Sequence, residues 1–492
     1  MTIRHTMFTA LALLLSAPAV AQEPAAEVAP PAASTPETDV ASASEPAAPT
    51  EAAPPAAPAS EAAPAAAPEP ASPTTPAADA APAAAPEAAP SVVEQSDDGP
   101  VLDLPPEVDA PVAPVAPTAG VYGAQQTIAQ FARRGSGVGG YAEMHYVHEN
   151  IGEDDSVADL DLHRLVLFVA NDLGADFRWY SEIEIEHAIV HEGSPGEVSV
   201  EQGFLDWFLF DDALALRAGV MLVPMGIINT WHEPPLFNGV ERPTVDKVVM
   251  PSTWSEGGVG MFGKSGPVRY ELYVVGGLNA ANFRAKDGIR KGRQKVGHAG
   301  ANGLAVTGRI EYEPVLGVVG GLAGYHGLAG PNGDLFKAGS DPMAPEELDI
   351  DVPVTGVSLD VRGRKLGIEA RAVFAAFAIG DTDELNASVD GETGEARNPG
   401  VGEQLIGGYA EAGYDVLYTA TTEQQLVPFV RFERYDTQVG IGGDSAITEW
   451  TMGASYRPMS QVAFKADYKH VAPEADGADS TQTLSLGVGV MY

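Results

Sequence analysis

The sequence predicts an all-β fold, a transmembrane antiparallel β-barrel of about sixteen strands. Three observations indicate it: polar and apolar residues alternate with a period of two, the strand-like segments are even in number, and their connections alternate between short and long. In YSEIEIEHA, residues 180–188, three glutamates alternate with two isoleucines. At the strand period the two kinds occupy opposite faces, which fits either a soluble sheet with one wet face or a barrel in lipid.

Alternation, β-branched and aromatic content and turn residues together define the strand-like segments. Their approximate ranges are 137–148, 158–171, 176–190, 198–209, 214–222, 256–263, 268–276, 303–312, 316–326, 352–362, 365–379, 404–416, 426–437, 448–456, 462–471 and 481–492. The phase of 426–437 stays ambiguous, because both of its faces carry apolar and charged residues.

The connections favour the membrane barrel. Short turns read NDLGAD, FDDA, GKSGP, EPVL, RGR and RPMS, and long connections cover about 222–255, 277–302, 327–351 and 380–403. Outer-membrane barrels have tight periplasmic turns and long outward loops, whereas a soluble sandwich has no reason to keep its long loops at one end. Closure also removes edge strands, whose unpaired backbone groups lipid does not tolerate.

The strand phase assigns charged residues to a water-filled lumen. In residues 214–220, for example, Leu214 and Leu216 face lipid while Arg217 faces inward. The closing segment TQTLSLGVGVMY keeps one apolar register up to Tyr492, and such a terminal aromatic resembles the assembly signal of outer-membrane barrels. The residues predicted to face the lumen are Arg178, Glu182, Glu184, Glu186, Arg217, Arg269, Glu271, Arg309, Glu311, Glu369 and Arg371.

The chain divides into four parts. Residues 1–21 read as a signal peptide, with Arg4 before a short apolar run and a small-x-small site ending at Ala21. Residues 22–120 form an Ala/Pro-rich linker that we expect to be disordered, because no aromatic residue lies between Phe8 and Tyr122. Residues 121–136 connect it to the barrel, residues 137–492. The linker is either an inert spacer or a tether toward peptidoglycan.

Charge and composition exclude some partners. The chain has 28 basic and 68 acidic residues, a net charge of −40, and no cysteine. Sixteen of the acidic residues lie in positions 1–120, so the rest of the chain still carries 52 acidic against 27 basic residues. An acidic folded domain argues against nucleic acid as a partner, and an exported chain of this length needs no disulfide.

Motifs for chemistry are weak. GVGMFGKS, residues 258–265, matches the phosphate-loop pattern, but Gly266 and Pro267 and a strand follow where that motif requires a helix. His187 and His191 share a face, yet Ala188 stands where a zinc protease would have its glutamate. We therefore expect no enzyme activity, no cofactor and no metal site, and a barrel-embedded enzyme ranks last among the alternatives.

The third outward connection, from Val223, differs from the other loops. It reads VPMGIINTWHEPPLFNGVERPTVDKVVMPSTWSEGGVG and is rich in Trp, Phe, Met and Pro. Such residues stabilise a loop little when they are exposed to water. We expect it to fold back against the barrel wall and narrow the pore. The constriction candidates are His232, Glu233, Glu241, Arg242, Asp246 and Lys247, which either set ion selectivity or pin the loop to the wall.

This loop, RWYSEIEIEHA and the strand number resemble the phosphate-selective porin O and P family of bacterial outer-membrane proteins. The resemblance covers most of residues 135–492 and implies a sixteen-stranded porin that assembles as a homotrimer. It leaves phosphate selectivity open, because the inward candidates mix arginines with glutamates. We expect a passive diffusion channel for small hydrophilic solutes or ions, in contact with outer-membrane lipid. The alternative is a structural anchor whose linker binds peptidoglycan.

Overall fold

The structure, a computed structural model, describes residues 136–152, 155–174, 176–191, 193–301, 303–330, 335–339, 346–390 and 393–492. The expected signal peptide, the linker and the connecting segment up to residue 135 lie outside this part. The strands are β1 Ser136–Ile151, β2 Asp155–Gly174, β3 Phe177–Glu186, β4 Glu197–Phe210, β5 Leu214–Leu222, β6 Ser255–Ser265, β7 Val268–Gly276, β8 Leu304–Val315, β9 Val318–Ala329, β10 Val352–Lys365, β11 Ile368–Ile379, β12 Gln404–Tyr414, β13 Gln425–Val439, β14 Ile447–Met459, β15 Val462–Pro473 and β16 Thr481–Met491.

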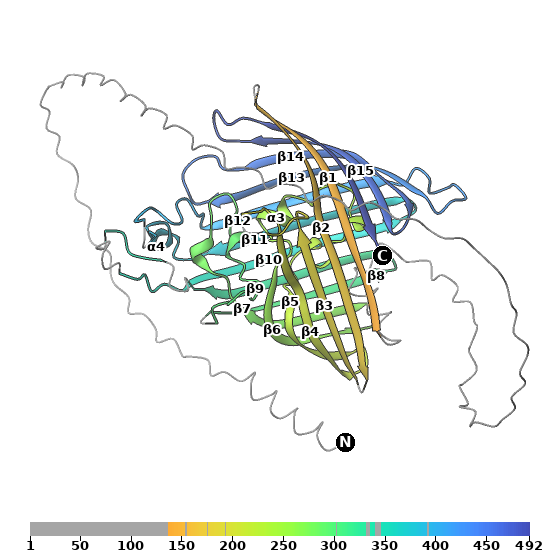
Figure 1. Cartoon of the computed structure of the whole chain (residues 1–492), viewed down its shortest axis with the longest axis horizontal. Helices are drawn as coiled ribbons and strands as arrows, with labels where there is room; N and C mark the ends of the chain where they lie inside the picture. Colours follow the sequence, from red (N-terminus) through yellow and green to blue (C-terminus); the bar gives the residue numbers. More distant parts are fainter. Residues whose placement is uncertain are drawn as a thin grey trace, which may run out of the picture. The chain divides into compact units, whose positions relative to one another are not determined.

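The strands form one closed antiparallel barrel (Figure 1). Each strand pairs with its neighbours in sequence, and β1 closes on β16 with Tyr141 opposite Met491. The backbone amide of Gly140 donates to the Tyr492 carbonyl at 2.8 Å, and the Tyr492 amide donates back at 2.9 Å. The predicted fold of about sixteen antiparallel strands is therefore confirmed. Closure pairs the first and last strands with each other, as a barrel in lipid requires.

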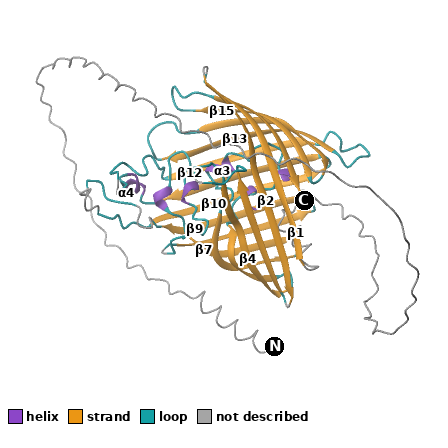
Figure 2. Ribbon diagram, viewed as in Figure 1, coloured by secondary structure: helices purple, strands orange, loops and turns teal. Residues whose placement is uncertain are grey.

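Short helices occur only in the connections of the described chain (Figure 2). They are η1 Ile228–Thr230, η2 Pro234–Leu236, α3 Val245–Val248, η3 Ala280–Asn282, η4 Arg290–Gly292 and α4 Thr382–Asn386. None of these described helices is long and apolar enough to cross a membrane.

Most connections alternate as expected, except that 415–424, between β12 and β13, is long for the short-turn end and 152–154, between β1 and β2, is short for the other. At the end where β1 starts and β16 finishes, the turn from β10 to β11 is Leu366–Gly367, with φ of 54° and 79°. Two successive residues with positive φ match the twist of a tight hairpin. At the opposite end lie the long connections 223–254, 277–303, 330–351 and 380–403. The phosphate-loop-like stretch falls in β6 and its turn to β7, so the helix that nucleotide binding needs is absent there.

The barrel exterior is apolar, as the strand phase predicts. Ile310, Leu322 and Leu359 stand opposite one another on β8, β9 and β10, and are 56%, 55% and 58% exposed. Near the short-turn end, the exterior also carries exposed aromatic side chains, among them Trp179, Phe210, Tyr312, Tyr414 and Tyr492. An apolar band with aromatic residues at its border is the surface that a lipid bilayer selects.

The apolar row gives a first testable prediction. Leu322→Arg puts a charge near the middle of β9 on the lipid-facing side and should destabilise the barrel by about 2–4 kcal/mol. The measurement is the urea unfolding midpoint in lipid vesicles. Ile189→Arg is the matched control, because Ile189 is 61% exposed but lies in the connection between β3 and β4. An equal drop of the urea unfolding midpoint in both variants would contradict a lipid-facing position for Leu322.

Candidate pore constriction

The connection between β5 and β6, residues 223–254, folds into the barrel; we call it the inserted loop. Val223, Met225, Ile228, Val245 and Trp254 are fully buried. Its η2 packs on β1, β15 and β16, and its α3 packs on β12 and β13. Figure 2 shows α3 among the strands and apart from the loops at the end of the barrel. The loop therefore contacts several parts of the wall, as its apolar composition predicts.

Asn229 ties the two ends of the inserted loop together. Its side-chain amide donates to the Val223 carbonyl at 2.6 Å and to the Trp254 carbonyl at 3.1 Å. Its side-chain oxygen, Oδ1, accepts a hydrogen bond from the Trp254 backbone amide at 2.8 Å. Trp254 in turn packs against Tyr325 on β9, with ring centroids 4.8 Å apart. The loop thus leaves and rejoins the wall through one fixed stem.

Acidic side chains of the wall hold the loop backbone. The Asp467 carboxylate on β15 accepts from the Val240 amide at 2.6 Å, and Glu433 on β13 accepts from the Val245 amide at 3.0 Å. The Thr244 hydroxyl donates to Glu449 on β14 at 2.7 Å. Hydrogen bonds to charged groups are stronger than neutral ones, so these contacts restrain α3 and the chain before it.

Basic side chains of the wall bind loop carbonyls. Lys465 Nζ donates to Gly239 O at 2.7 Å and lies 3.7 Å from the centre of the Phe237 ring. Arg457 Nε donates to Pro235 O at 3.1 Å. Prolines 234 and 235 cannot donate backbone hydrogen bonds, so the turn at η2 offers only acceptors to the wall. The wall supplies the matching cations.

The six constriction candidates fall into two groups. His232, Glu233, Arg242 and Asp246 are buried, and Arg242 Nη2 donates to the His232 carbonyl at 3.2 Å. Lys247 is exposed and the Glu241 side chain is 34% exposed. Of the buried four, His232 contacts Glu182 and Glu201 of the wall, whereas Arg242 binds within the loop. Glu241 and Lys247 are the two solvent-accessible candidates.

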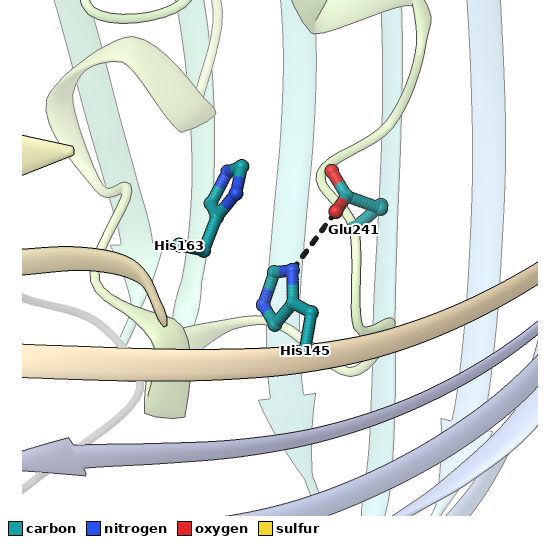
Figure 3. Close-up of side chains that lie close together, drawn as sticks. All are labelled: His145, His163 and Glu241. Atoms are coloured by element: carbon teal, nitrogen blue, oxygen red, sulfur yellow. Dashed lines mark hydrogen bonds and ion pairs between the residues drawn. The ribbon is translucent and has the colours of Figure 1, made fainter. Parts of the chain in front are cut away.

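Glu241 contacts His145 of the wall, and the His163 ring lies beside that of His145 (Figure 3). His145 Nδ1 on β1 lies 3.0 Å from Glu241 Oε1, and His145 Nε2 lies 3.2 Å from Glu143 Oε2. The His163 ring on β2 stacks on the His145 ring with centroids 4.7 Å apart. Burial alone would raise the pKa of Glu241, but its hydrogen bond with His145 holds that pKa well below the usual range. Glu241 therefore keeps a negative charge beside the lumen.

Two predicted lumen residues, Glu182 and Glu184, face inward but do not face water. Each is 1% exposed, in contrast to the expected open lumen. Glu184 Oε1 accepts from Arg164 Nη1 at 2.9 Å, and Glu182 lies next to His232 of the inserted loop. The loop covers this part of the wall, which sequence periodicity does not reveal.

The other predicted lumen residues lie on the inner phase, and most are paired there. Arg217 Nε lies 2.8 Å from Asp206, Arg309 Nη1 lies 2.7 Å from Asp360, and Arg371 Nε lies 3.2 Å from Glu411. Three others form ion pairs: Arg269 with Glu311 and Glu313, Glu311 with Arg309 and Arg362, and Glu369 with Arg364 and Arg457. Glu271 accepts a hydrogen bond from Tyr273, and the Arg178 guanidinium lies over the Phe208 ring. Glu186 stands opposite Arg164 in the strand register.

Sequence reasoning missed the wall residues that hold the loop. Lys465 and Asp467 alternate with apolar residues along 462–468, which indicates the face they occupy but not that they bind a loop. Glu201 was missed because the register between β3 and β4 shifts after Glu182, so that Glu201 and Gln202 are both buried. A β-bulge adds one residue to a strand and changes its phase locally, which strict alternation does not anticipate.

The fold and the inserted loop define a transmembrane β-barrel whose lumen is partly filled by its own third outward loop. The chain belongs to the same family as an uncharacterized protein of Aquifex aeolicus (strain VF5). The two are 32% identical over 367 residues, which cover 72% of this chain and 79% of that protein. No family model matches the chain, so membership of the phosphate-selective porin O and P family is not confirmed.

Structural neighbours are bacterial outer-membrane proteins with low sequence identity. An anion-selective porin from Comamonas acidovorans has 11% identity, a TM-score of 0.48, and coverage of 73% of this chain and 99% of that one. OprB of Pseudomonas putida has 11% identity, a TM-score of 0.48, and coverage of 75% and 97%. The outer membrane channel DcaP of Acinetobacter baumannii has 12% identity, a TM-score of 0.46, and coverage of 73% and 97%.

The stem gives a second prediction. Asn229→Ala removes three hydrogen bonds at the stem and should loosen the inserted loop, seen as faster proteolysis within residues 223–254 of the folded barrel. Asn386→Ala is the matched control. Asn386 makes a similar two-way contact with Val401, but in the connection between β11 and β12. Equal protection of the inserted loop in both variants would contradict the role of Asn229.

A third prediction concerns Asp246 in α3. Burial raises its pKa from 3.8 to about 7, with Glu433 and Asp360 acting in the same direction and the Tyr409 hydroxyl and Arg371 partly offsetting them. A raised folded-state pKa leaves stability intact below the unfolded value and lowers it as pH rises toward 7. Asp246→Asn, which does not ionise, should therefore raise the urea midpoint above wild type at pH 8 and leave it unchanged near pH 4.

Asp476→Asn is the control for this experiment, because Asp476 lies exposed in the connection between β15 and β16. An Asp246→Asn midpoint equal to wild type at pH 8 would show that the buried carboxylate carries no ionisation cost.

Proposed function

We propose that this chain is an outer-membrane porin, a passive diffusion channel for small hydrophilic solutes or ions. The observation that carries the proposal is an apolar barrel exterior around a charged interior, with one loop held across that interior. Barrels of 16–18 strands leave an aqueous channel, whereas eight-stranded barrels are filled by their side chains. A loop fixed to the wall narrows such a channel permanently and does not act as a moving gate.

Charge pairing on the wall favours weak selectivity. Arg217, Arg309 and Arg371 each contact a carboxylate within 3.2 Å, so their positive charge is largely neutralised where solutes would pass. Glu241 and Lys247 are the constriction candidates that remain accessible, and they carry opposite charges. This arrangement supports a general channel over one with a continuous row of arginines for phosphate.

An anion preference is the competing outcome. The connection between β7 and β8 lines a hollow of about 620 Å³ with Arg284, Lys286, Lys291 and one acid, Asp287. A basic surface of this kind attracts small anions by long-range electrostatics. The anchor alternative depends on residues 22–117, outside the described part of the chain, and the proposed homotrimer follows from the resemblance alone.

The fourth prediction tests the accessible pair. Lys247→Glu replaces a positive charge beside the lumen by a negative one, which at about 4 Å in water changes an ion's energy by roughly 2 kcal/mol in total. The cation-to-anion permeability ratio should rise about fivefold or more, read as the reversal potential under a salt gradient. Lys337→Glu is the control, because Lys337 lies in the connection between β9 and β10 beside Glu346. Identical reversal potentials in both variants and wild type would remove Lys247 from the solute path.

A further inference from the structure

Three ligand-bearing side chains meet under the inserted loop, away from the accessible pair. Glu182 lies on β3, Glu201 on β4, and His232 on the loop between η1 and η2. They are 1%, 2% and 3% exposed. His232 Nε2 lies 3.4 Å from Glu182 Oε1 and 3.5 Å from Glu201 Oε2, and the three ligand atoms lie within 4.8 Å of one another. We call this group the buried triad.

The surroundings orient the triad inward. His232 Nδ1 lies 3.1 Å from the Asn229 backbone carbonyl, an acceptor, so Nδ1 carries a proton and Nε2 is the nitrogen directed at the glutamates; with an ion bound, the neutral ring would present its Nε2 lone pair. Glu182 Oε2 accepts from Tyr180 at 3.3 Å and from the Gln202 amide, which leaves Oε1 toward His232. Such outer contacts, which fix the tautomer and the carboxylate, typically accompany metal ligands.

Within the described residues, His232 is the basic side chain that contacts the two glutamates. Glu201 is buried, and its oxygens make no close hydrogen bond in the described chain; the nearest donor is His232 Nε2, 3.5 Å from Oε2. The neighbouring Arg164 is directed to Glu143 at 2.7 Å and to Glu184 at 2.9 Å, and no lysine or arginine of the described chain forms an ion pair with Glu182 or Glu201. A buried carboxylate without close donors, as Glu201 is, is costly. A divalent ion would neutralise both while the imidazole stays neutral.

The spacing also fits an ion better than hydrogen bonds. Charged N–H···O bonds are about 2.7–2.9 Å long, shorter than the two contacts of His232. A tetrahedral ion with ligands at about 2.0–2.1 Å sets neighbouring ligand atoms about 3.3 Å apart, close to the observed 3.4 and 3.5 Å. We propose that Glu182, Glu201 and His232 bind a divalent transition-metal ion of the Zn²⁺ type, which fixes the inserted loop to the β3–β4 wall.

The histidine pair of Figure 3 provides an internal comparison. Both nitrogens of His145 are engaged at ordinary hydrogen-bond distances, with Glu241 at 3.0 Å and Glu143 at 3.2 Å. Its ring stacks on His163, which also contacts Asp161 at 3.1 Å. Hydrogen bonds and stacking account for this group without an ion, and it is more open to water than the buried triad.

The test is metal binding by the folded, mature protein in detergent. After treatment with a chelator and its removal, the protein is titrated with Zn²⁺, and with Co²⁺, whose visible absorption reports tetrahedral coordination. Wild type and His163→Ala should each bind about one equivalent in the buried triad. His232→Ala and the nearly isosteric Glu201→Gln should weaken that binding at least about 100-fold. Heat-dependent mobility on a gel verifies that each variant is folded.

Two results would overturn the proposal: folded wild type that binds neither ion, or binding that persists in Glu201→Gln and His232→Ala but disappears in His163→Ala. The second result would place the ion at the histidines of Figure 3. Glu201→Gln keeps the test decisive if His232→Ala does not fold.

Discussion

The structure depends on the way charged wall residues and the inserted loop satisfy one another. Asp467 and Glu433 accept hydrogen bonds from loop amides, and Lys465 and Arg457 donate to loop carbonyls. In a narrow lumen, each of these charges would otherwise keep its own shell of water, and each loop amide would need another acceptor. These four partners lie on β13, β14 and β15, and His232 of the loop also contacts Glu182 on β3, so the loop is held from more than one side. In the proposed channel, the position of this loop sets the width.

The same pairing shapes the electrostatics of the proposed channel. A charge buried against an opposite charge contributes little field to a passing ion, while an accessible charge contributes its full field at short range. Arg431 illustrates the first case, because it is 2% exposed and contacts both Glu411 and Glu433. Lys247 illustrates the second. The net charge of the chain is therefore a poor guide to ion preference, which depends on a few residues at the narrowest point.

Much of the barrel was predictable from the sequence, because its side-chain phase follows a local rule. The alternation of Glu182, Ile183 and Glu184 gave the correct inner and outer faces, and Leu484 and Leu486 are exposed on the outer face as expected. The ambiguous segment 426–437 resolves into β13, with Arg431 and Glu433 inward and Arg434 outward. Arg434 lies near the strand end, where it pairs with Glu474. From periodicity alone, the sequence did not show that Arg431 faces inward whereas Arg434, near the strand end, faces outward.

The site was less predictable, since its contacts join residues far apart in the chain. Val240 and Asp467 are 227 positions apart, and Val245 and Glu433 are 188 apart. The composition of the loop indicated that it folds inward, but not which wall residues receive it. For this reason the six candidates divide into buried and accessible groups that the sequence did not distinguish. The bulge that brings Glu201 beside Glu182 is likewise a property of strand pairing.

The most direct measurement is the single-channel conductance of the purified barrel and of a variant with residues 226–252 replaced by a short turn. The account predicts stable open steps for wild type and a several-fold larger unitary conductance for the shortened variant, because the inserted loop occupies the lumen. Equal conductance in the two proteins would contradict the loop as the constriction, and folded wild-type barrels that pass no current would contradict the channel itself.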